Sequence, residues 1–226
     1  MDRKVDLDAM KDSQRTEGDD APVEDVSVSD FAGAIPSTPG IRLSKLALAH
    51  ALVLLLSLSM FGAADAWSAV TGLGIAGALA IVTGAIAGVV VSNLVHEWFH
   101  LLGAKVTNAS YTIPDKLGLF LYDWDFSQNN TRQFLVMSFA GTVGGIVAML
   151  LLFNAIPADT WGRAALLAGA VASFVFGSFI EWPVILRTRR TGKPMEELAK
   201  INESVLARSF TAAALTLIVG TIYIAP

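Results

Sequence analysis

The chain of 226 residues is 54% hydrophobic and 16% charged, whereas soluble globular domains contain about a quarter charged residues. This composition favours a membrane protein over a soluble domain. The formal net charge is −4, and the chain has no cysteine, which excludes disulfides, thiolate metal sites and a cysteine nucleophile. No broad basic surface is indicated, so we do not expect nucleic acid as a partner.

The first part of the chain differs sharply from the rest. Residues 1–40 hold ten acidic and four basic residues and very few large apolar ones. Such a segment cannot bury enough apolar surface to offset the entropy of ordering. We therefore predict a disordered acidic tail over 1–40 and a membrane domain over 41–226.

Five apolar runs approach or exceed the ~20 residues that a membrane-spanning helix needs. They cover residues 44–64, 70–103, 133–155, 163–187 and 206–225. If the tail is cytoplasmic, eleven of the twelve Lys and Arg residues in 41–226 fall on the cytoplasmic side, as the positive-inside rule requires. We expect an all-α, multi-pass integral membrane protein in the lipid bilayer, with its N-terminus cytoplasmic and its C-terminus outside.

The connection between the second and third runs indicates a short interfacial β-hairpin. Residues 109–113 and 117–126 have the pattern of two strands, and the second strand alternates aromatic residues on one face: Phe120, Tyr122, Trp124 and Phe126. Aromatic residues of this kind anchor a hairpin at the membrane interface. An exposed strand edge can also pair with an extended peptide, so Phe120, Tyr122 and Trp124 are candidate substrate-binding residues.

The second run ends in the motif His96-Glu97-Trp98-Phe99-His100, which matches the zinc-binding pattern His-Glu-x-x-His. Residues i and i+4 of a helix share one face, so His96 and His100 can bind one zinc ion while Glu97 acts as the catalytic base. The alternative is a pair of histidines that hydrogen-bonds neighbouring helices. Ionisable residues within an apolar span are costly, which favours a functional site.

A catalytic zinc site needs a third protein ligand. Glu181 lies near the cytoplasmic end of the fourth run, at the depth expected for the histidines, and we predict that it completes the site. Glu181 could instead form an ion pair with Arg187 or Arg189. Asp123 and Asp125 of the hairpin are the next candidates.

Small residues recur every four positions on the second and fourth runs. Such stripes let membrane helices approach closely, so we predict that these two helices pack together and converge on the site. The stripes comprise Ala76, Ala80, Gly84, Gly88 and Ser92 on one helix, and Ala165, Gly169, Ser173 and Gly177 on the other.

Two further polar residues in the runs are candidates with open roles. His50, in the first run, is a fourth ligand, a group that hydrogen-bonds substrate, or an imidazole among lipid headgroups. Asn93 shares the helix face of Glu97 and either binds a substrate carbonyl or packs between helices.

The order of these motifs resembles the site-2 protease family of intramembrane zinc metalloproteases. The similar segments are VHEWFHLLGAKV at 95–106, the hairpin, SFAGTVGG at 138–145 and FIEWPV at 179–184. The resemblance implies a membrane-embedded zinc site that cleaves membrane proteins. Glu181 stands about where the family has the aspartate of a Leu-Asp-Gly motif.

We therefore expect an intramembrane zinc metalloprotease that cleaves a transmembrane or membrane-associated protein near the cytoplasmic face. Two other functions remain open. One is a b-type haem protein for electron transfer, with His50 and either His96 or His100 as axial ligands. The other is a catalytically silent membrane scaffold that binds client helices.

Overall fold

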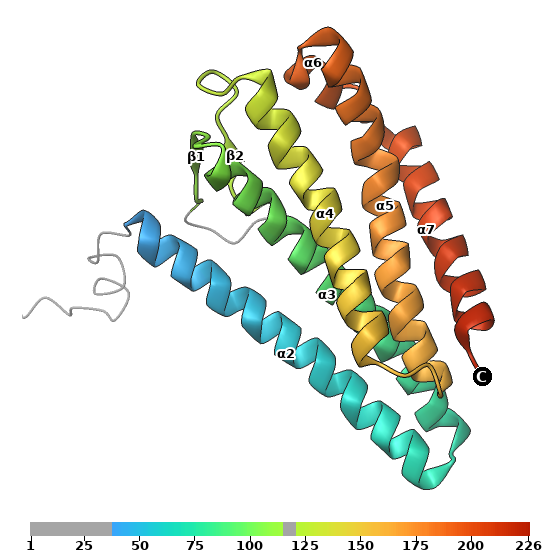
Figure 1. Ribbon diagram of the computed structural model, residues 1–226. Helices are drawn as coiled ribbons and strands as arrows, with labels where there is room; N and C mark the ends of the chain where they lie inside the picture. Colours follow the sequence, from blue (N-terminus) through green and yellow to red (C-terminus); the bar gives the residue numbers. More distant parts are fainter. Residues whose placement is uncertain (1–37, 115–120) are drawn as a thin grey trace, which may run out of the picture. The chain divides into compact units, whose positions relative to one another are not determined.

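The computed structural model describes residues 38–114 and 121–226. Five helices in these residues are long and apolar enough to cross a membrane, and they confirm the predicted all-α, multi-pass architecture. They are α2 (Pro39–Thr71), α3 (Gly74–Val106), α4 (Thr131–Ala155), α5 (Trp161–Thr191) and α7 (Glu203–Ile224) (Figure 1). A short helix, α6 (Pro194–Leu198), joins α5 to α7.

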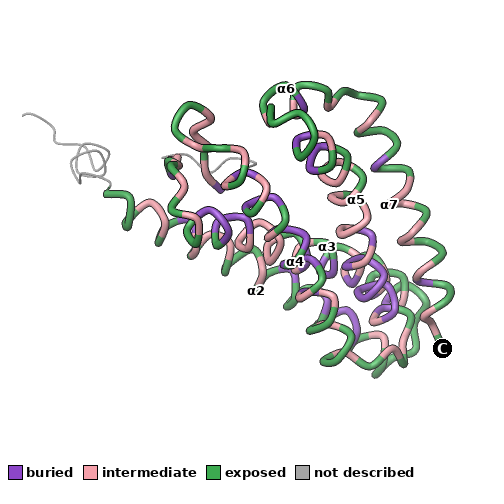
Figure 2. Tube along the Cα trace, turned by 45° about the horizontal axis from the view of Figure 1, so that its top comes forward, coloured by how far each residue is buried: buried purple, intermediate pink, exposed green. Residues whose placement is uncertain are grey.

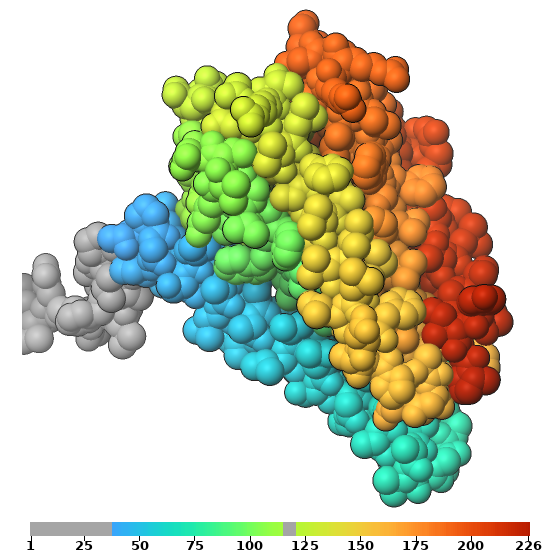
Figure 3. Space-filling model, viewed as in Figure 1, coloured from blue at the N-terminus to red at the C-terminus, as the bar shows by residue number. Residues whose placement is uncertain are grey.

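Helix α3 lies at the centre of the helix packing and contacts α2, α4 and α5, while α7 packs against α5. Consecutive long helices run in opposite directions. The start of α2, the β-strands and α6 therefore lie at one end of the bundle, here called the hairpin end (Figure 1). The C-terminus lies at the opposite end, and the space-filling view shows α7 in red alongside α5 in orange (Figure 3).

Burial is concentrated on α3, α4 and α5, whereas α2 and α7 are largely exposed (Figure 2). The exposed residues include large apolar side chains such as Leu56, which is 63% exposed, and Ile222, also 63% exposed. Many exposed large apolar side chains on long helices are typical of a protein that meets another apolar phase. It supports a bilayer environment for the bundle.

Four of the five observed helices are longer than the predicted apolar runs because polar caps, not hydropathy, set their ends. The exception is α3: its predicted start at 70 is wrong, because α2 continues to Thr71 and α3 begins at Gly74. Thr38 caps α2, which has proline at its first position, so this helix begins within the predicted tail; residues 1–37 lie outside the described part of the chain. Gly72 ends α2 with φ of 64°, a left-handed conformation that favours glycine. Asn130 and Gln133 form a capping box at the start of α4.

The hairpin has the predicted place but shorter strands. Within the described residues, only Tyr111–Thr112 (β1) and Asp123–Trp124 (β2) pair, and they are antiparallel. After β2 the chain turns, because Asp125 Oδ1 accepts hydrogen bonds from the amides of Ser127 and Gln128. The predicted extension of the second strand through 126 is therefore wrong, and its start at 117–120 lies outside the described residues.

The predicted close packing of the second and fourth spans is confirmed. A β-carbon on Gly84 or Gly88 of α3 would overlap a backbone carbonyl of α5, and one on Gly169 of α5 would overlap the carbonyl of Ala85. The nearest atom to each of these glycines is a backbone carbonyl oxygen, so the two backbones meet directly. This packing sets the distance between His96 and His100, which follow on α3, and Glu181, which follows on α5.

An ion pair joins α2 to α5 at the end opposite the hairpin. Asp65 of α2 is 8% exposed and accepts hydrogen bonds from Arg163 Nε at 2.9 Å and from Thr160 Oγ1 at 3.0 Å. Arg163 also contacts Asp159, whose side chain is 61% exposed. Arg163 thus binds two aspartates, the buried Asp65 and the exposed Asp159.

Asp65→Asn should lower the free energy of unfolding by about 1–3 kcal/mol, less than for a fully buried ion pair because a third of the Arg163 side chain is exposed. Asp159→Asn removes the exposed partner of the same arginine and should cost less than ~1 kcal/mol. Thermal unfolding of the purified variants in detergent measures the difference. Equal losses would contradict the structural role of Asp65.

Glu197 anchors α6 against the end of α5. Its side chain is 2% exposed, and Oε2 lies 2.7 Å from Lys200 Nζ and 2.9 Å from Arg187 Nε. The hydrogen bond from Lys200 lowers the pKa of Glu197 below its ordinary value of 4.5, and the charge of Arg187 adds to this effect. The ionised carboxylate is therefore the form that the folded linker prefers.

Because the folded-state pKa of Glu197 is lowered, its stabilising effect is complete above pH 4.5 and is lost as the pH falls through the folded-state value. Glu197→Gln should therefore lower the melting temperature at pH 7, and the gap to wild type should narrow below about pH 4.5. Glu196→Gln, at a side chain that is 62% exposed, is the control. A gap that stays constant with pH would contradict this assignment.

Candidate metal centre

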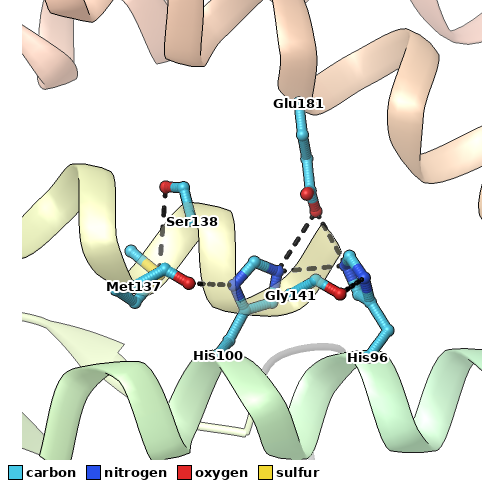
Figure 4. A network of polar contacts seen from close by, with 6 residues as sticks. All are labelled: His96, His100, Met137, Ser138, Gly141 and Glu181. Atoms are coloured by element: carbon cyan, nitrogen blue, oxygen red, sulfur yellow. Dashed lines mark hydrogen bonds and ion pairs between the residues drawn. The ribbon is translucent and has the colours of Figure 1, made fainter. Parts of the chain in front are cut away.

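Two histidines of α3 meet at the hairpin end of the bundle. Their one-turn spacing places both rings on one face of α3, directed toward α4 and α5. His96 Nε2 and His100 Nε2 are 3.0 Å apart (Figure 4). The two nitrogens that can hold a metal therefore already converge.

Backbone carbonyls of α4 fix the orientation of both rings. His96 Nδ1 donates to the carbonyl of Gly141 at 2.8 Å, and His100 Nδ1 donates to that of Met137 at 2.9 Å. A carbonyl only accepts hydrogen bonds, so each Nδ1 carries a proton, and Nε2 is the ring nitrogen left to hold a metal. Metal-binding histidines are typically oriented in this way.

Glu181 of α5 approaches the two rings from the opposite side (Figure 4). Its Oε1 lies 2.8 Å from His96 Nε2 and 3.2 Å from His100 Nε2. The ion-pair partner of Arg187 is Glu197, on α6. The structure thus brings together the three residues that we predicted as metal ligands, from two helices far apart in sequence.

The donor set and its dimensions fit a small divalent cation. Zinc binds nitrogen and oxygen at roughly 2.0–2.2 Å in tetrahedral geometry, which separates ligand atoms by about 3.3–3.5 Å. The three atoms of His96, His100 and Glu181 are 2.8–3.2 Å apart, so small side-chain shifts suffice. Two imidazole lone pairs that face each other also need a cation or a proton between them.

Glu97 lies beside this triangle. Ligand atoms of His96, Glu97 and His100 all lie within 4.8 Å of one another, and these three residues could hold a metal ion. Two carboxylates therefore flank the imidazole pair, Glu97 from α3 and Glu181 from α5. One can bind a cation while the other exchanges a proton.

Glycine on α4 makes room for the rings. A β-carbon at Gly141 would overlap the imidazole of His100, and one at Gly144 would lie 2.5 Å from Phe99 Cβ. The SFAGTVGG segment therefore supplies the carbonyl of Gly141 and the space beside it. Sequence reasoning missed Met137 and Gly141 as hydrogen-bond acceptors, although the clustered glycines were a visible signal of close approach.

Gly141→Ala should displace the His100 ring and abolish metal binding, because the new methyl group occupies the same space. Gly177→Ala is the matched control, since its β-carbon would lie at an ordinary 3.8 Å from the His96 ring. Metal content after purification in detergent, measured together with helix content, checks the prediction. Full metal content in Gly141→Ala would contradict the geometry.

A cavity of about 440 Å³ adjoins the centre at the hairpin end. Glu97, His100 and Glu181 line it on one side, and the remaining lining is mostly apolar and aromatic: Leu121, Tyr122, Trp124, Phe126, Phe134, Met137, Ile180, Val184, Ile185, Leu198 and Ile201, with Asp123 and Ser138. Such a volume and lining are typical of ligand pockets.

Two hydroxyl groups line this cavity and can donate hydrogen bonds. Ser138 is 6% exposed, and its only partner in the described residues is the sulfur of Met137 at 4.0 Å. Burial raises the pKa of Tyr122, and the carboxylates of Glu97 and Glu181 raise it further. Tyr122 therefore remains protonated at neutral pH and keeps its O–H group.

A second cavity, of about 30 Å³, adjoins His96 on the side of the membrane interior. Ser92, Thr142 and Ser173 line it. Ser92 is 1% exposed and Thr142 5%. The hydroxyl groups make this small space polar.

The other candidate residues lie around the centre in different ways. His50 Nδ1 accepts a hydrogen bond from Trp98 Nε1 at 3.2 Å, and Trp98 is about 200° around α3 from His96. His50 is therefore on the far side of α3. Asn93 lines the small polar cavity, and Asp123 lines the large one.

Asp125 lines neither of the two cavities beside the centre. Asp125 Oδ1 accepts from the amide and hydroxyl of Ser127 at 2.9 and 2.6 Å, and these hydrogen bonds lower its pKa. It serves as a turn cap. Phe120 lies outside the described residues.

Comparison with protein-family models gives no match, and no curated protein or solved structure is significantly similar to this chain. The interpretation of the centre therefore depends on its own geometry.

Proposed function

We propose that the protein is an intramembrane zinc metallopeptidase that cleaves membrane-associated polypeptides near the cytoplasmic face. One observation carries the proposal: two carbonyl-oriented imidazoles present their Nε2 atoms to one oxygen of Glu181, with Glu97 alongside. The resemblance of the motif order to site-2 proteases adds support. We accordingly assign the metal to His96, His100 and Glu181.

The chemistry divides between the metal and the chain. When bound, zinc polarises the scissile carbonyl and lowers the pKa of water to about 7. Glu97 accepts a proton from the attacking water as the water oxygen bonds to the carbonyl carbon. Glu97 then returns that proton to the amine nitrogen as the carbon–nitrogen bond breaks. Ser138 and Tyr122 are available to donate hydrogen bonds to the carbonyl oxygen.

The hairpin is the proposed docking element for substrate. In the described residues, β1 and β2 pair only with each other, so each strand has an unpaired edge. An extended peptide can add to such an edge, and Tyr122 and Trp124 line the cavity that leads to Glu97. A helical substrate would need to unwind first, because its carbonyls are hydrogen-bonded within the helix.

The geometry favours this proposal over the two alternatives. A haem with two axial histidines needs both imidazoles on one side of α3, whereas His50 is on the side opposite His96. A silent scaffold needs no convergent ligand set and no ionisable cluster in an apolar helix. An optical spectrum without a haem band would agree with the zinc assignment.

The purified protein should contain about one zinc per chain, and His96→Ala combined with His100→Ala should remove it. Glu181→Gln should weaken zinc binding, because a neutral amide replaces an anionic ligand. Metal analysis after dialysis against a mild chelator measures both effects. Zinc retained at wild-type affinity in Glu181→Gln would show that another residue is the third ligand.

Glu97→Gln should keep zinc and stability but lower cleavage by at least 100-fold, because the amide has the same shape and cannot accept the proton. Membranes that contain wild-type or variant protein can be compared by mass spectrometry of new peptide termini. Glu196→Gln, an exposed carboxylate on α6, is the matched control. Normal cleavage by Glu97→Gln would refute the peptidase mechanism.

A further inference from the structure

A groove between α5 and α7 combines an apolar wall with a basic rim. Its volume is about 300 Å³, at the lower end of the range for ligand sites. The apolar wall consists of Phe179, Ile180, Pro183, Ile201 and Val205, and the rim carries Arg187, Lys200 and Arg208; no acidic residue lines it. The two helices that form the groove are both long and apolar enough to cross a membrane.

The positive charge of the rim is only partly balanced. Arg187 Nε and Lys200 Nζ both contact the same oxygen of Glu197, which is 2% exposed. The contact from Arg187 Nε is short but lacks hydrogen-bond geometry, so this buried donor is unsatisfied. Three cations thus face one carboxylate, which leaves a net charge of about +2 at the rim.

Arg208 contributes a cation without a carboxylate partner in the described residues. Its Nε donates to the carbonyl of Ser204 at 3.1 Å, and Nη2 donates to the hydroxyl of Ser204 at 3.0 Å. Both contacts are within α7 and position the guanidinium at the groove. The group is held in place while its charge stays available to a ligand.

Pro183 is part of the apolar wall. Proline has no amide hydrogen, so it removes the usual helical donor to the carbonyl one turn earlier. A ligand with an anionic group beside an apolar body would match the rim and the wall together.

We propose that the groove binds an anionic phospholipid of the phosphatidylglycerol type. The phosphate lies among Arg187, Lys200 and Arg208, and an acyl chain packs on the apolar wall. Basic pockets between membrane helices bind lipid headgroups in this way. Such binding needs neither zinc nor peptide cleavage.

The bound lipid would also contact the back of the candidate metal centre. Ile180 and Ile201 line both this groove and the large cavity that contains Glu97 and Glu181. They form a wall one side chain thick between the two spaces. A lipid bound in the groove would therefore pack against the residues that form the apolar side of the large cavity.

The test is a titration of the full-length protein in dodecyl maltoside with dioleoylphosphatidylglycerol or dioleoylphosphatidylcholine, followed by native mass spectrometry. We expect one saturable site for phosphatidylglycerol and at least five-fold weaker binding of phosphatidylcholine. Millimolar inorganic phosphate should not displace the lipid. Equal binding of the two lipids, or full displacement by phosphate, would overturn the proposal.

Matched variants separate the groove from general attraction to the basic face. Arg208→Gln should weaken binding about five-fold, as expected for ~1 kcal/mol per basic residue. Arg190→Gln removes the same charge from an exposed position that does not line the groove, and should change the affinity by less than about two-fold. Equal effects would overturn the proposal.

A charge-neutral variant tests the apolar wall. Val205→Phe adds bulk to the groove and should weaken lipid binding while leaving the melting temperature without lipid within about 2 °C of wild type. Unchanged lipid affinity in this variant, with the fold intact, would show that the acyl chain lies elsewhere and would overturn the site.

Discussion

Helix α3 meets α5 at points where a single β-carbon on Gly84, Gly88 or Gly169 would overlap the facing backbone. This direct contact between backbones keeps the two helices at a fixed distance and rotation, because dispersion contacts fall off steeply with separation. His96 and His100 follow on one helix and Glu181 on the other. The separation of about 3 Å between the two Nε2 atoms and Glu181 Oε1 is a consequence of that packing.

Helices α3 and α5 set the distance between the two histidines and Glu181, and helix α4 orients the two imidazole rings. The carbonyls of Met137 and Gly141 accept from the two imidazoles, although most carbonyls of a membrane helix bond only to their own helix. Each carbonyl has two lone pairs and can serve both partners. The rings gain a defined tautomer without any additional polar side chain in the apolar region, where each such group is costly.

The polar groups of the bundle are segregated by depth. Asp65 and Arg163 form an ion pair at the end opposite the hairpin, whereas the candidate metal centre, Glu197 and the basic groove lie toward the hairpin end. Ile180 and Ile201 separate the groove from the large cavity. Lipid and polypeptide would thus meet opposite faces of the same thin wall.

The amino-acid sequence by itself determined the five spans, the histidine pair and the packing stripes, because hydropathy and helical spacing are local properties. It also indicated Glu181 through its depth along the fourth span. The far-side position of His50 and the carbonyl partners of both imidazoles were decided by tertiary structure. Each depends on how one helix is rotated against another, and short-range sequence patterns carry no information about that rotation. The basic groove likewise exists only because α7 returns beside α5 and brings Arg208 to Arg187 and Lys200.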